Sequence, residues 1–379
     1  KIESIQRPDG IRFASARPPD FERWWEYSWV FHGLNANKRS ITLDMSQPEG
    51  VRLARALIRD ADLVVENFSP RVMDSFGLGW EEIQRLQPRA SLVRMPAFGT
   101  RGPWRDRVGL AQTMEQLSGM AYVTGFADGL PVIPRGVCDG IAGLQACFAS
   151  LLAIWPVAGE SGNGRGHLVE CNMVESALGV AAESVVTHSA YGVLLERDGN
   201  RDPFRAPQNL YACRGTEQWL ALSVETDAHW RALCVWLGDP SWARDEAFAD
   251  TAGRRAGQDR IDAALAAHFA EHDLEATVEG LVSAGIPAAP VVPSPLVMRN
   301  PQHLARGFYE TVEHPVAGAQ PYPRLPMRFA AGPERHVAKP APLLGQDNDA
   351  VLGERLGLDA NARSALREAG VVGERPHGY

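Results

Sequence analysis

A chain of 379 residues is longer than one hydrophobic core usually supports, so two domains are expected. Hydrophobic residues make up 45% of the chain and charged residues 22%, which indicates a folded protein and excludes a disordered or fibrous one. The net charge of −8 argues against a nucleic-acid binder, which normally carries a concentrated basic surface. The five cysteines are scattered singly, which favours reduced thiols in the cytoplasm and gives no zinc-binding spacing.

The N-terminal half alternates between strand-like and helix-like patterns after an irregular start. Residues 1–40 have no clear period and are expected to form extended segments and loops. Residues 40–44 form a strand pattern, and Ser46 with Glu49 has the form of a capping box before a helix. Short apolar strands are predicted at 62–66 and 91–95, with a helix at 79–86 between them.

This alternation predicts βαβ units and a parallel sheet. Ligands of such sheets bind at the carboxyl ends of the strands. Asn67 and Phe68 and the loop 96–110 follow strand ends, so they are candidate site residues. Asn67 and Phe68 suit either a nucleotide contact or an ordinary turn. Arg105 and Arg107 could bind a phosphate group or could be ordinary surface cations without a ligand.

The middle of the chain carries its most apolar segment. Residues 139–155 are apolar nearly all round, which predicts a buried helix rather than a membrane span, for which the run is too short. A strand at 167–172 and a helix at 173–188 follow. Residues 200–208 are expected to be a loop between domains, and a strand at 219–224, a helix at 228–237 and two further helices to residue 284 form a second unit. The chain beyond residue 310 is rich in proline, with few periods.

Two carboxylates are candidates for chemistry. Glu175 is predicted in the first turn of a helix, where the helix dipole favours its ionised form by about 0.3–1 kcal/mol. Such a carboxylate can attack a thioester carbonyl, although a Glu that only serves the helix fits the same pattern. Asp139 fits either a helix N-cap or a general base. The sequence contains no nucleotide-binding glycine motif, zinc-protease motif or serine-hydrolase motif.

Several motifs together resemble family III CoA-transferases, the group that includes formyl-CoA transferase, carnitine CoA-transferase and α-methylacyl-CoA racemase. The resemblance runs from Lys1 to about residue 330. It rests on the order and spacing of these segments: 37–44, 65–68, 77–80, 99–103, Ser118-Gly119, 164–166, 173–175 and 300–308.

The resemblance implies a fold and an assembly. The fold is α/β, with a large domain built on a Rossmann-like parallel sheet and a smaller α/β domain. The implied division is a CoA-binding domain at 1–200, a small domain at 201–310 and a segment at 311–379 that returns to the large domain. Two chains of the family interlock, so a cytoplasmic homodimer is expected, with neither nucleic acid nor membrane as a partner.

The resemblance also implies site residues. The family nucleophile is an Asp whose position matches Glu175, and the extra methylene lengthens the reach of the carboxylate by about 1.5 Å. A family arginine is replaced by Ser75, and Arg107 is one candidate to replace its phosphate contact. No metal is implied. The implied coenzyme A contacts are Leu43, Asp44, Met45, Ser46, Asn67, Phe68, Ser69, Gly109 and Leu110.

The implied activity is transfer of CoA between an acyl-CoA and a carboxylic acid through a glutamyl anhydride and a glutamyl-CoA thioester. One alternative is a racemase or isomerase that uses Asp139, but Leu110 stands where the racemase has its histidine. The other alternative is a CoA-binding subunit that has lost catalysis.

Overall fold

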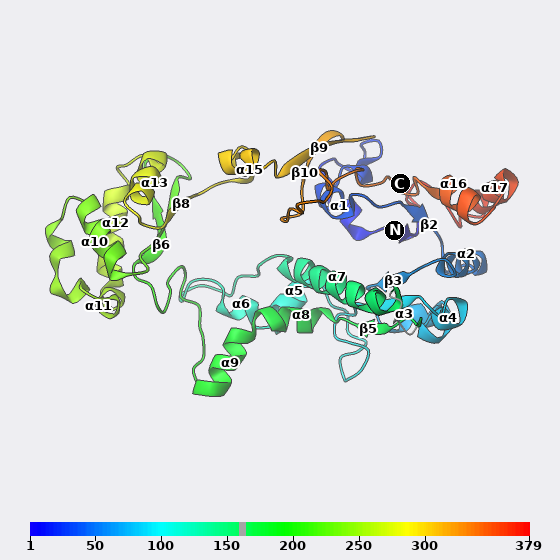
Figure 1. Ribbon diagram of the computed structural model, residues 1–379, viewed down its shortest axis with the longest axis horizontal. Coiled ribbons are helices and arrows are strands. Elements are labelled where there is room, and N and C mark those ends of the chain that lie inside the picture. The colour runs from blue at the N-terminus through cyan, green and yellow to red at the C-terminus, as the bar shows by residue number, and fades with distance from the viewer. Residues whose placement is uncertain (159–163) are drawn as a thin grey trace. The chain divides into compact units, whose positions relative to one another are not determined.

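The computed structural model describes residues 1–158 and 164–379, which divide into two compact units (Figure 1). Unit 1 comprises Lys1–Met114, Gly136–Gly179 and Asn300–Tyr379, and unit 2 comprises Glu115–Arg135 and Val180–Arg299. The fold is α/β with small parallel and antiparallel sheets. Each unit is built from segments that alternate along the chain. The division into domains at 1–200, 201–310 and 311–379 stays a prediction.

The strands of unit 1 are parallel, apart from one hairpin. β1 (Ile2–Glu3) pairs with β2 (Ile41–Thr42), and β3 (Leu63–Glu66), β4 (Ser91–Arg94) and β5 (Leu168–Glu170) form a sheet in the order β3-β4-β5. The strands predicted at 62–66, 91–95 and 167–172 are therefore confirmed. β9 (Tyr309–His314) and β10 (Gly318–Pro323) form an antiparallel hairpin in the proline-rich region, where no strand was predicted.

In unit 1, α7 packs against β4 and β5, and α2 and α4 share a core cluster with β4. The helix predicted at 79–86 is α4, whereas α1 lies in a region predicted to be irregular. The bounds are α1 (Trp29–Asn35), α2 (Pro48–Ile58), α3 (Arg71–Ser75), α4 (Trp80–Leu86), α5 (Ala111–Leu117), α7 (Val137–Ala158), α8 (Met173–Val180), α15 (Pro301–Ala305), α16 (Asn348–Ala350) and α17 (Ala360–Glu368), where α5 and α8 run over into unit 2.

The capping box predicted before α2 is wrong. The helix begins at Pro48 with Gln47 as N-cap, and no side chain bonds to its free N–H groups. The Ser46 hydroxyl instead donates to Asp44 at 2.6 Å, and Glu49 pairs with Arg52. Proline is pre-organised for the first helical position, so the helix starts two residues after Ser46 and leaves that side chain out of reach.

The C-terminal segment is part of the core of unit 1. Leu352, Val371 and Val372 pack in one cluster with Leu43 and Leu92. Asn348 fixes the connection: its side-chain oxygen accepts the N–H of Thr42 at 2.8 Å, and its amide donates to the carbonyl of Gly373 at 3.1 Å. Residues more than 300 positions apart therefore share one hydrogen-bond network.

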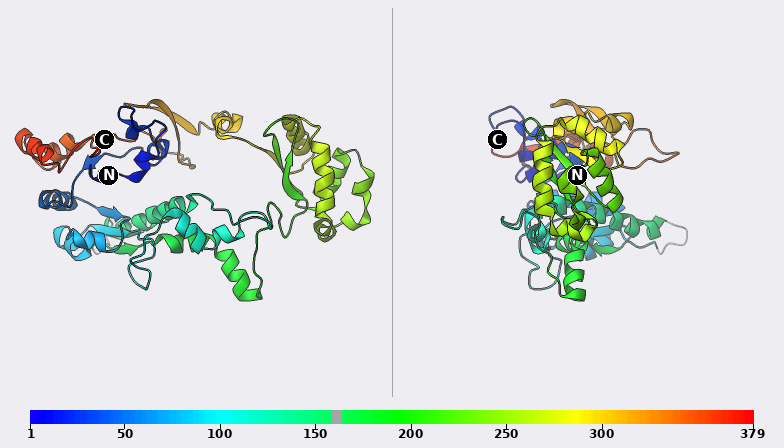
Figure 2. Two further views of the ribbon diagram at one scale, coloured as in Figure 1. Left: turned by 180° about the vertical axis from the view of Figure 1, so that it is seen from behind. Right: turned by 90° about the vertical axis from the view of Figure 1, so that its left-hand side faces the viewer.

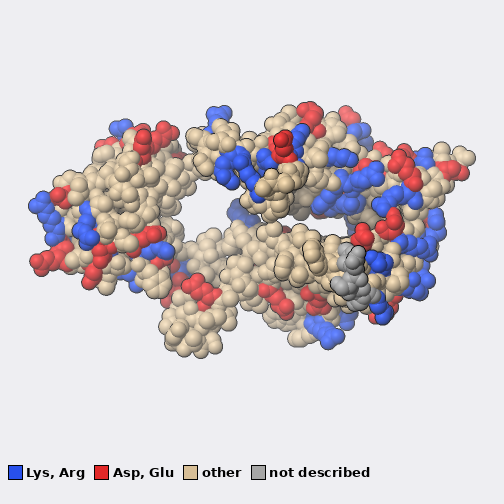
Figure 3. All heavy atoms as spheres, viewed as in Figure 1, with Lys and Arg blue, Asp and Glu red and all other residues tan. Residues whose placement is uncertain are grey.

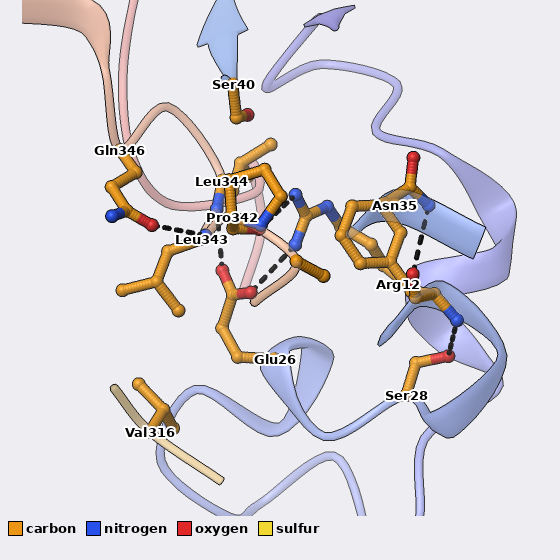
Figure 4. Close-up of polar contacts among 12 residues, drawn as sticks. Arg12, Glu26, Ser28, Asn35, Ser40, Val316, Pro342, Leu343, Leu344 and Gln346 are labelled. Carbon is orange, nitrogen blue, oxygen red and sulfur yellow. Dashed lines mark hydrogen bonds and ion pairs between the residues drawn. The ribbon is translucent and has the colours of Figure 1, made fainter. Parts of the chain in front are cut away.

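A buried ion network joins the first residues of the chain to the same segment (Figure 4). Arg12 is fully buried and donates to Glu3 at 2.9 Å, to Glu26 at 2.7 Å and to the carbonyl of Pro342 at 3.3 Å. The other oxygen of Glu26 accepts the N–H of Leu344 at 2.9 Å. Because a buried charge is tolerated only when it is paired and hydrogen-bonded, these contacts fix residues 1–26 against 342–344.

The helix predicted to be buried at 139–155 is α7, and that prediction is wrong for the single chain. One face carries small residues, including Ala142, Ala146 and Ala153, which are buried. The opposite face exposes large apolar side chains, with Leu144 76% and Trp155 82% exposed. This exposed stripe consists of Leu144, Phe148, Leu151, Leu152 and Trp155. By length and composition α7 could also cross a membrane.

Unit 2 is an antiparallel sheet with helices on one face (Figures 1 and 2). Its strands are β6 (Gln208–Ala212), β7 (Trp219–Ser223) and β8 (Ala288–Val291), in that order. Leu220 and Leu222 pack with the helices, which confirms the strand predicted at 219–224. The helices that share a core with the sheet are α10 (Asp227–Trp236), α12 (Gln258–Phe269) and α13 (Leu274–Ser283). Unit 2 also contains α6 (Met120–Val123), α9 (Ala182–Tyr191), α11 (Thr251–Ala256) and α14 (Ser294–Val297), whose described residues lie outside that core.

Candidate functional site

The candidate site lies where β3, β4 and β5 end. Because the three strands are parallel, the segments that follow them leave the sheet at one edge. These segments begin with Asn67 after β3, with Met95 after β4 and with Cys171 after β5. Neighbouring strands lie about 4.8 Å apart, so the ends of β3 and β5 are separated by about 10 Å.

A pocket of about 630 Å³ adjoins β3. Its wall is mostly apolar and comes from α2 and β3, including Leu57, Ile58 and Val64. Asn67 and Phe68 line it at the strand end, together with Met45. Two cations, Lys1 and Lys38, also line the pocket, so it combines an apolar wall with positive charge.

The turn that carries Asn67 and Phe68 is held by a buried ion pair. Glu66 and Arg94 approach to 2.7 Å, and the second oxygen of Glu66 accepts the N–H of Phe68 at 2.8 Å. Arg94 also donates to the carbonyl of Pro70. This pairing accounts for a Glu and an Arg inside short apolar strands, and it keeps the turn rigid.

The segment after β2 contributes side chains of two kinds. Leu43 is fully buried in the core, so a ligand can meet only its backbone. Asp44 is buried, and although burial opposes its charged form, hydrogen bonds from Ser46 and Gln47 hold its pKa below the usual range. Ser46 is exposed, and Ser69, after β3, is half-buried.

The loop after β4 is folded tightly against its own start. A methyl group at Gly109 would lie 2.1 Å from Met114 Cε and 2.5 Å from Ala97 Cβ, so only glycine fits there. Arg107 is exposed and stacks on Trp104, with its guanidinium carbon 4.3 Å from the ring centroid. Leu110 is exposed at the end of this loop.

Glu175 is the third residue of α8, as predicted for a first-turn position. Four N–H groups at this helix end are bonded: Met173 donates to Pro96 and Val174 to Ala97, while Glu175 donates to the side-chain oxygen of Asn172 at 3.0 Å and Ser176 to its carbonyl oxygen at 3.3 Å. Asn172 is buried and caps the helix. The carboxylate of Glu175 is exposed, and no hydrogen bond or ion pair engages it within residues 1–158 and 164–379.

A small apolar cluster contains the residues that directly precede the two candidate carboxylates, Asp139 and Glu175. It joins the loop after β4 through Ala97 and Phe98, α7 through Cys138, and α8 through Met173 and Val174. Asp139 follows Cys138, and Glu175 follows Val174. Asp139 is exposed and is the third residue of α7, so its interpretation as an N-cap is wrong.

Sequence reasoning missed Asn172 and the Glu66–Arg94 pair. Asn172 carries a recognisable signal, because an Asn followed three residues later by a Glu at a helix start is a capping pattern. The ion pair has no such signal, since its partners are 28 residues apart. Among the described residues, no group of three or more His, Cys, Asp or Glu could hold a metal ion.

Comparison with known proteins gives a consistent result. The model of CoA-transferase family III matches residues 1–348. The succinyl-CoA–D-citramalate CoA-transferase of Chloroflexus aurantiacus is 29% identical over 350 residues, which cover 92% of this chain and 84% of the relative. The formyl-CoA:oxalate CoA-transferase of Afipia carboxidovorans is 27% identical over 370 residues, covering 92% and 86%. A crystal structure of a CAIB/BAIF family protein from Brucella suis superimposes with a TM-score of 0.82 at 27% identity, covering 94% of this chain and 91% of that one.

Proposed function

Because this chain belongs to CoA-transferase family III and is a CaiB/BaiF-type enzyme, we propose that it moves CoA between an acyl-CoA and a carboxylic acid with Glu175 as nucleophile. The observation that carries this proposal is the free carboxylate of Glu175 on the first turn of α8. α8 begins just after β5, and the pocket lined by Asn67 and Phe68 lies at the end of β3, so both are at the carboxyl ends of the parallel strands.

The chemistry divides into two reversible halves. A Glu175 oxygen attacks the thioester carbonyl, the carbon–sulfur bond breaks, and CoA leaves as a thiolate while a mixed anhydride forms. The thiolate then attacks the Glu175 carbonyl of the anhydride, releasing the first acid and leaving a glutamyl-CoA thioester. The acceptor carboxylate attacks this thioester to give a second anhydride, from which the thiolate takes the new acyl group and frees Glu175.

The pocket beside β3 suits coenzyme A as a substrate. Phe68 offers an aromatic face, Asn67 offers an amide, and Lys38 offers positive charge for a phosphate group, whereas the ammonium group of Lys1 pairs with Asp9 at 2.7 Å. The proposed contacts also include the backbone of Leu43, the segment Asp44, Met45 and Ser46, and Ser69. Gly109 and Leu110 come from the loop after β4, where the acyl end would lie, and Arg107 of the same loop would meet a phosphate group.

A Rossmann-like large domain, an interlocked homodimer and a cytoplasmic location complete the proposal. The exposed stripe on α7 supports the dimer, because one chain leaves five large apolar side chains uncovered. The other face of α7 packs small residues against the sheet and binds it, with the Ser91 hydroxyl donating to the carbonyl of Ala153 at 3.2 Å. Because one face of α7 packs on the sheet, we expect a second protein chain, and not lipid, to cover the exposed stripe on its other face.

The dimer is tested by light scattering of the Phe148→Asp and Leu152→Asp variants. Both are expected to shift the protein toward monomers. A wild-type protein that is monomeric at micromolar concentration would reject the assembly and leave the chemistry open.

The nucleophile is tested by trapping during turnover. Hydroxylamine or borohydride, added with an acyl-CoA panel that starts with the succinyl-CoA and formyl-CoA of the relatives' names, is expected to modify Glu175. Glu175→Ala should abolish transfer, whereas Glu183→Ala is a matched control because Glu183 is an exposed first-turn Glu of α9. An active Glu175→Ala variant without any trapped adduct would reject the proposal.

A further inference from the structure

A second, smaller pocket in unit 1 lies away from the residues discussed so far. It has a volume of about 190 Å³ and forms where the chain leaves α15 and where it leaves β10. The N–H of Arg324 donates to the carbonyl of Phe308 at 2.8 Å, and the Arg328 guanidinium donates to the carbonyl of Arg306, so the two segments are held together. Figure 3 shows Lys and Arg gathered beside α15 and β10.

The lining of this pocket is basic in a protein that is acidic overall. It contains Arg306, Arg324 and Arg328 and no acidic residue. Arg324 is neutralised from outside the pocket by Glu310 at 3.0 Å, and the same carboxylate pairs with Arg335 at 3.3 Å. The exposed guanidinium groups of Arg306 and Arg328 pair with no carboxylate in the part of the chain that the structure describes.

The rest of the lining is apolar. Phe308, Leu325, Pro326 and Met327 complete the pocket. Its volume of about 190 Å³ suits a ligand of the size of a short organic acid. A guanidinium binds a carboxylate through two parallel hydrogen bonds, and an apolar wall adds contact for a short carbon chain.

We propose that this pocket binds a short-chain carboxylate, with Arg306 and Arg328 on its oxygens and Leu325 and Met327 on its carbon chain. The guanidinium groups of Arg306 and Arg328, which pair with no carboxylate among the described residues, supply the charge that the ligand neutralises. The site does not depend on Glu175, so it adds a carboxylate-binding position to the one that the transfer reaction requires.

The test is calorimetric titration of the full chain with butyrate, acetate and inorganic phosphate at constant ionic strength. Butyrate is expected to bind saturably and more tightly than acetate, because the apolar wall favours the longer chain. Replacing Arg306 or Arg328 with Gln should weaken butyrate binding at least about tenfold, since a charge-assisted pair is lost. Arg306→Lys keeps the charge and should weaken it less.

Two control variants separate this site from others. Arg335→Gln removes an arginine that shares Glu310 but does not line the pocket, so it should leave butyrate binding unchanged. Glu175→Ala should also leave it unchanged, which distinguishes this site from the proposed reaction. The proposal is overturned if no ligand binds saturably, if phosphate alone binds, or if Arg306→Gln and Arg328→Gln bind butyrate like the wild type.

Discussion

His314 should make unit 1 less stable as the pH falls from about 7 to about 5. The imidazole is 1% exposed, and its Nδ1 accepts the N–H groups of Val316 at 3.3 Å and Ala317 at 3.0 Å. It also stacks on His32, with ring centroids 4.2 Å apart. Burial, with the nearby charges of His32 and Arg12, lowers the pKa of His314 from 6.5 to about 4. A protonated Nδ1 would face two N–H donors, so the geometry also favours the neutral ring.

The direction and size of the effect follow from proton linkage. Between pH 6.5 and about 4 the unfolded chain binds a proton at His314 that the folded chain does not, so acid favours unfolding. The stability that the neutral ring contributes is present above pH 6.5 and is lost as the pH falls toward 4. With these two pKa values, the free energy of unfolding should fall by roughly 2 kcal/mol between about pH 7 and about pH 5 from this group alone.

The assay compares thermal or denaturant unfolding of the wild type and of His314→Asn at both pH values. The Asn side-chain oxygen can still accept the N–H groups of Val316 and Ala317, but it cannot take up a proton. Other titrating groups are common to both proteins and cancel in the difference. The wild type should lose roughly 2 kcal/mol more than the variant. Equal losses would refute the reasoning, because His314 would then titrate alike in both states.

Substitutions at three further positions test the site and the core. Asn172→Ala should lower kcat more than it raises KM because it frees the start of α8, whereas Asn172→Asp should restore most of the activity, as an Asp can also cap the helix. Phe68→Ala should raise KM for the acyl-CoA several-fold with little change in thermal stability, since the ring lines the pocket and is partly exposed. Arg12→Leu should destabilise unit 1 by about 3–5 kcal/mol in denaturant titrations, because it leaves Glu3 and Glu26 buried without their cation; a loss below about 1 kcal/mol would contradict the importance of that network.

Local patterns predicted much of the parallel part of the fold. The strands β3, β4 and β5 and the helix α4 follow from apolar runs of the right length between turn residues. The hairpin β9–β10 escaped prediction because Pro321 and Pro323 within its second strand argue against a strand, although an edge strand tolerates them. The exposure of α7 could not be predicted, since an all-round apolar helix suits its own core and a partner chain equally.

The position of Glu175 was predictable, but its surroundings were not. A Glu that follows a strand pattern and opens a segment of helical spacing is predicted to lie in the first turn of a helix. The family resemblance then implies that this Glu is the nucleophile. The partners of its helix end come from the loop after β4, 77 residues earlier in the chain, and only the fold brings Pro96 and Ala97 there.

The way α8 begins limits what that helix can contribute to the reaction. The N–H groups of Met173, Val174, Glu175 and Ser176 are all taken by protein oxygens. The helix therefore lends Glu175 a favourable field but has no donor left for the negative oxygen of a tetrahedral adduct. Under the proposed mechanism, stabilisation of that oxygen has to come from donors other than the backbone N–H groups at the start of α8.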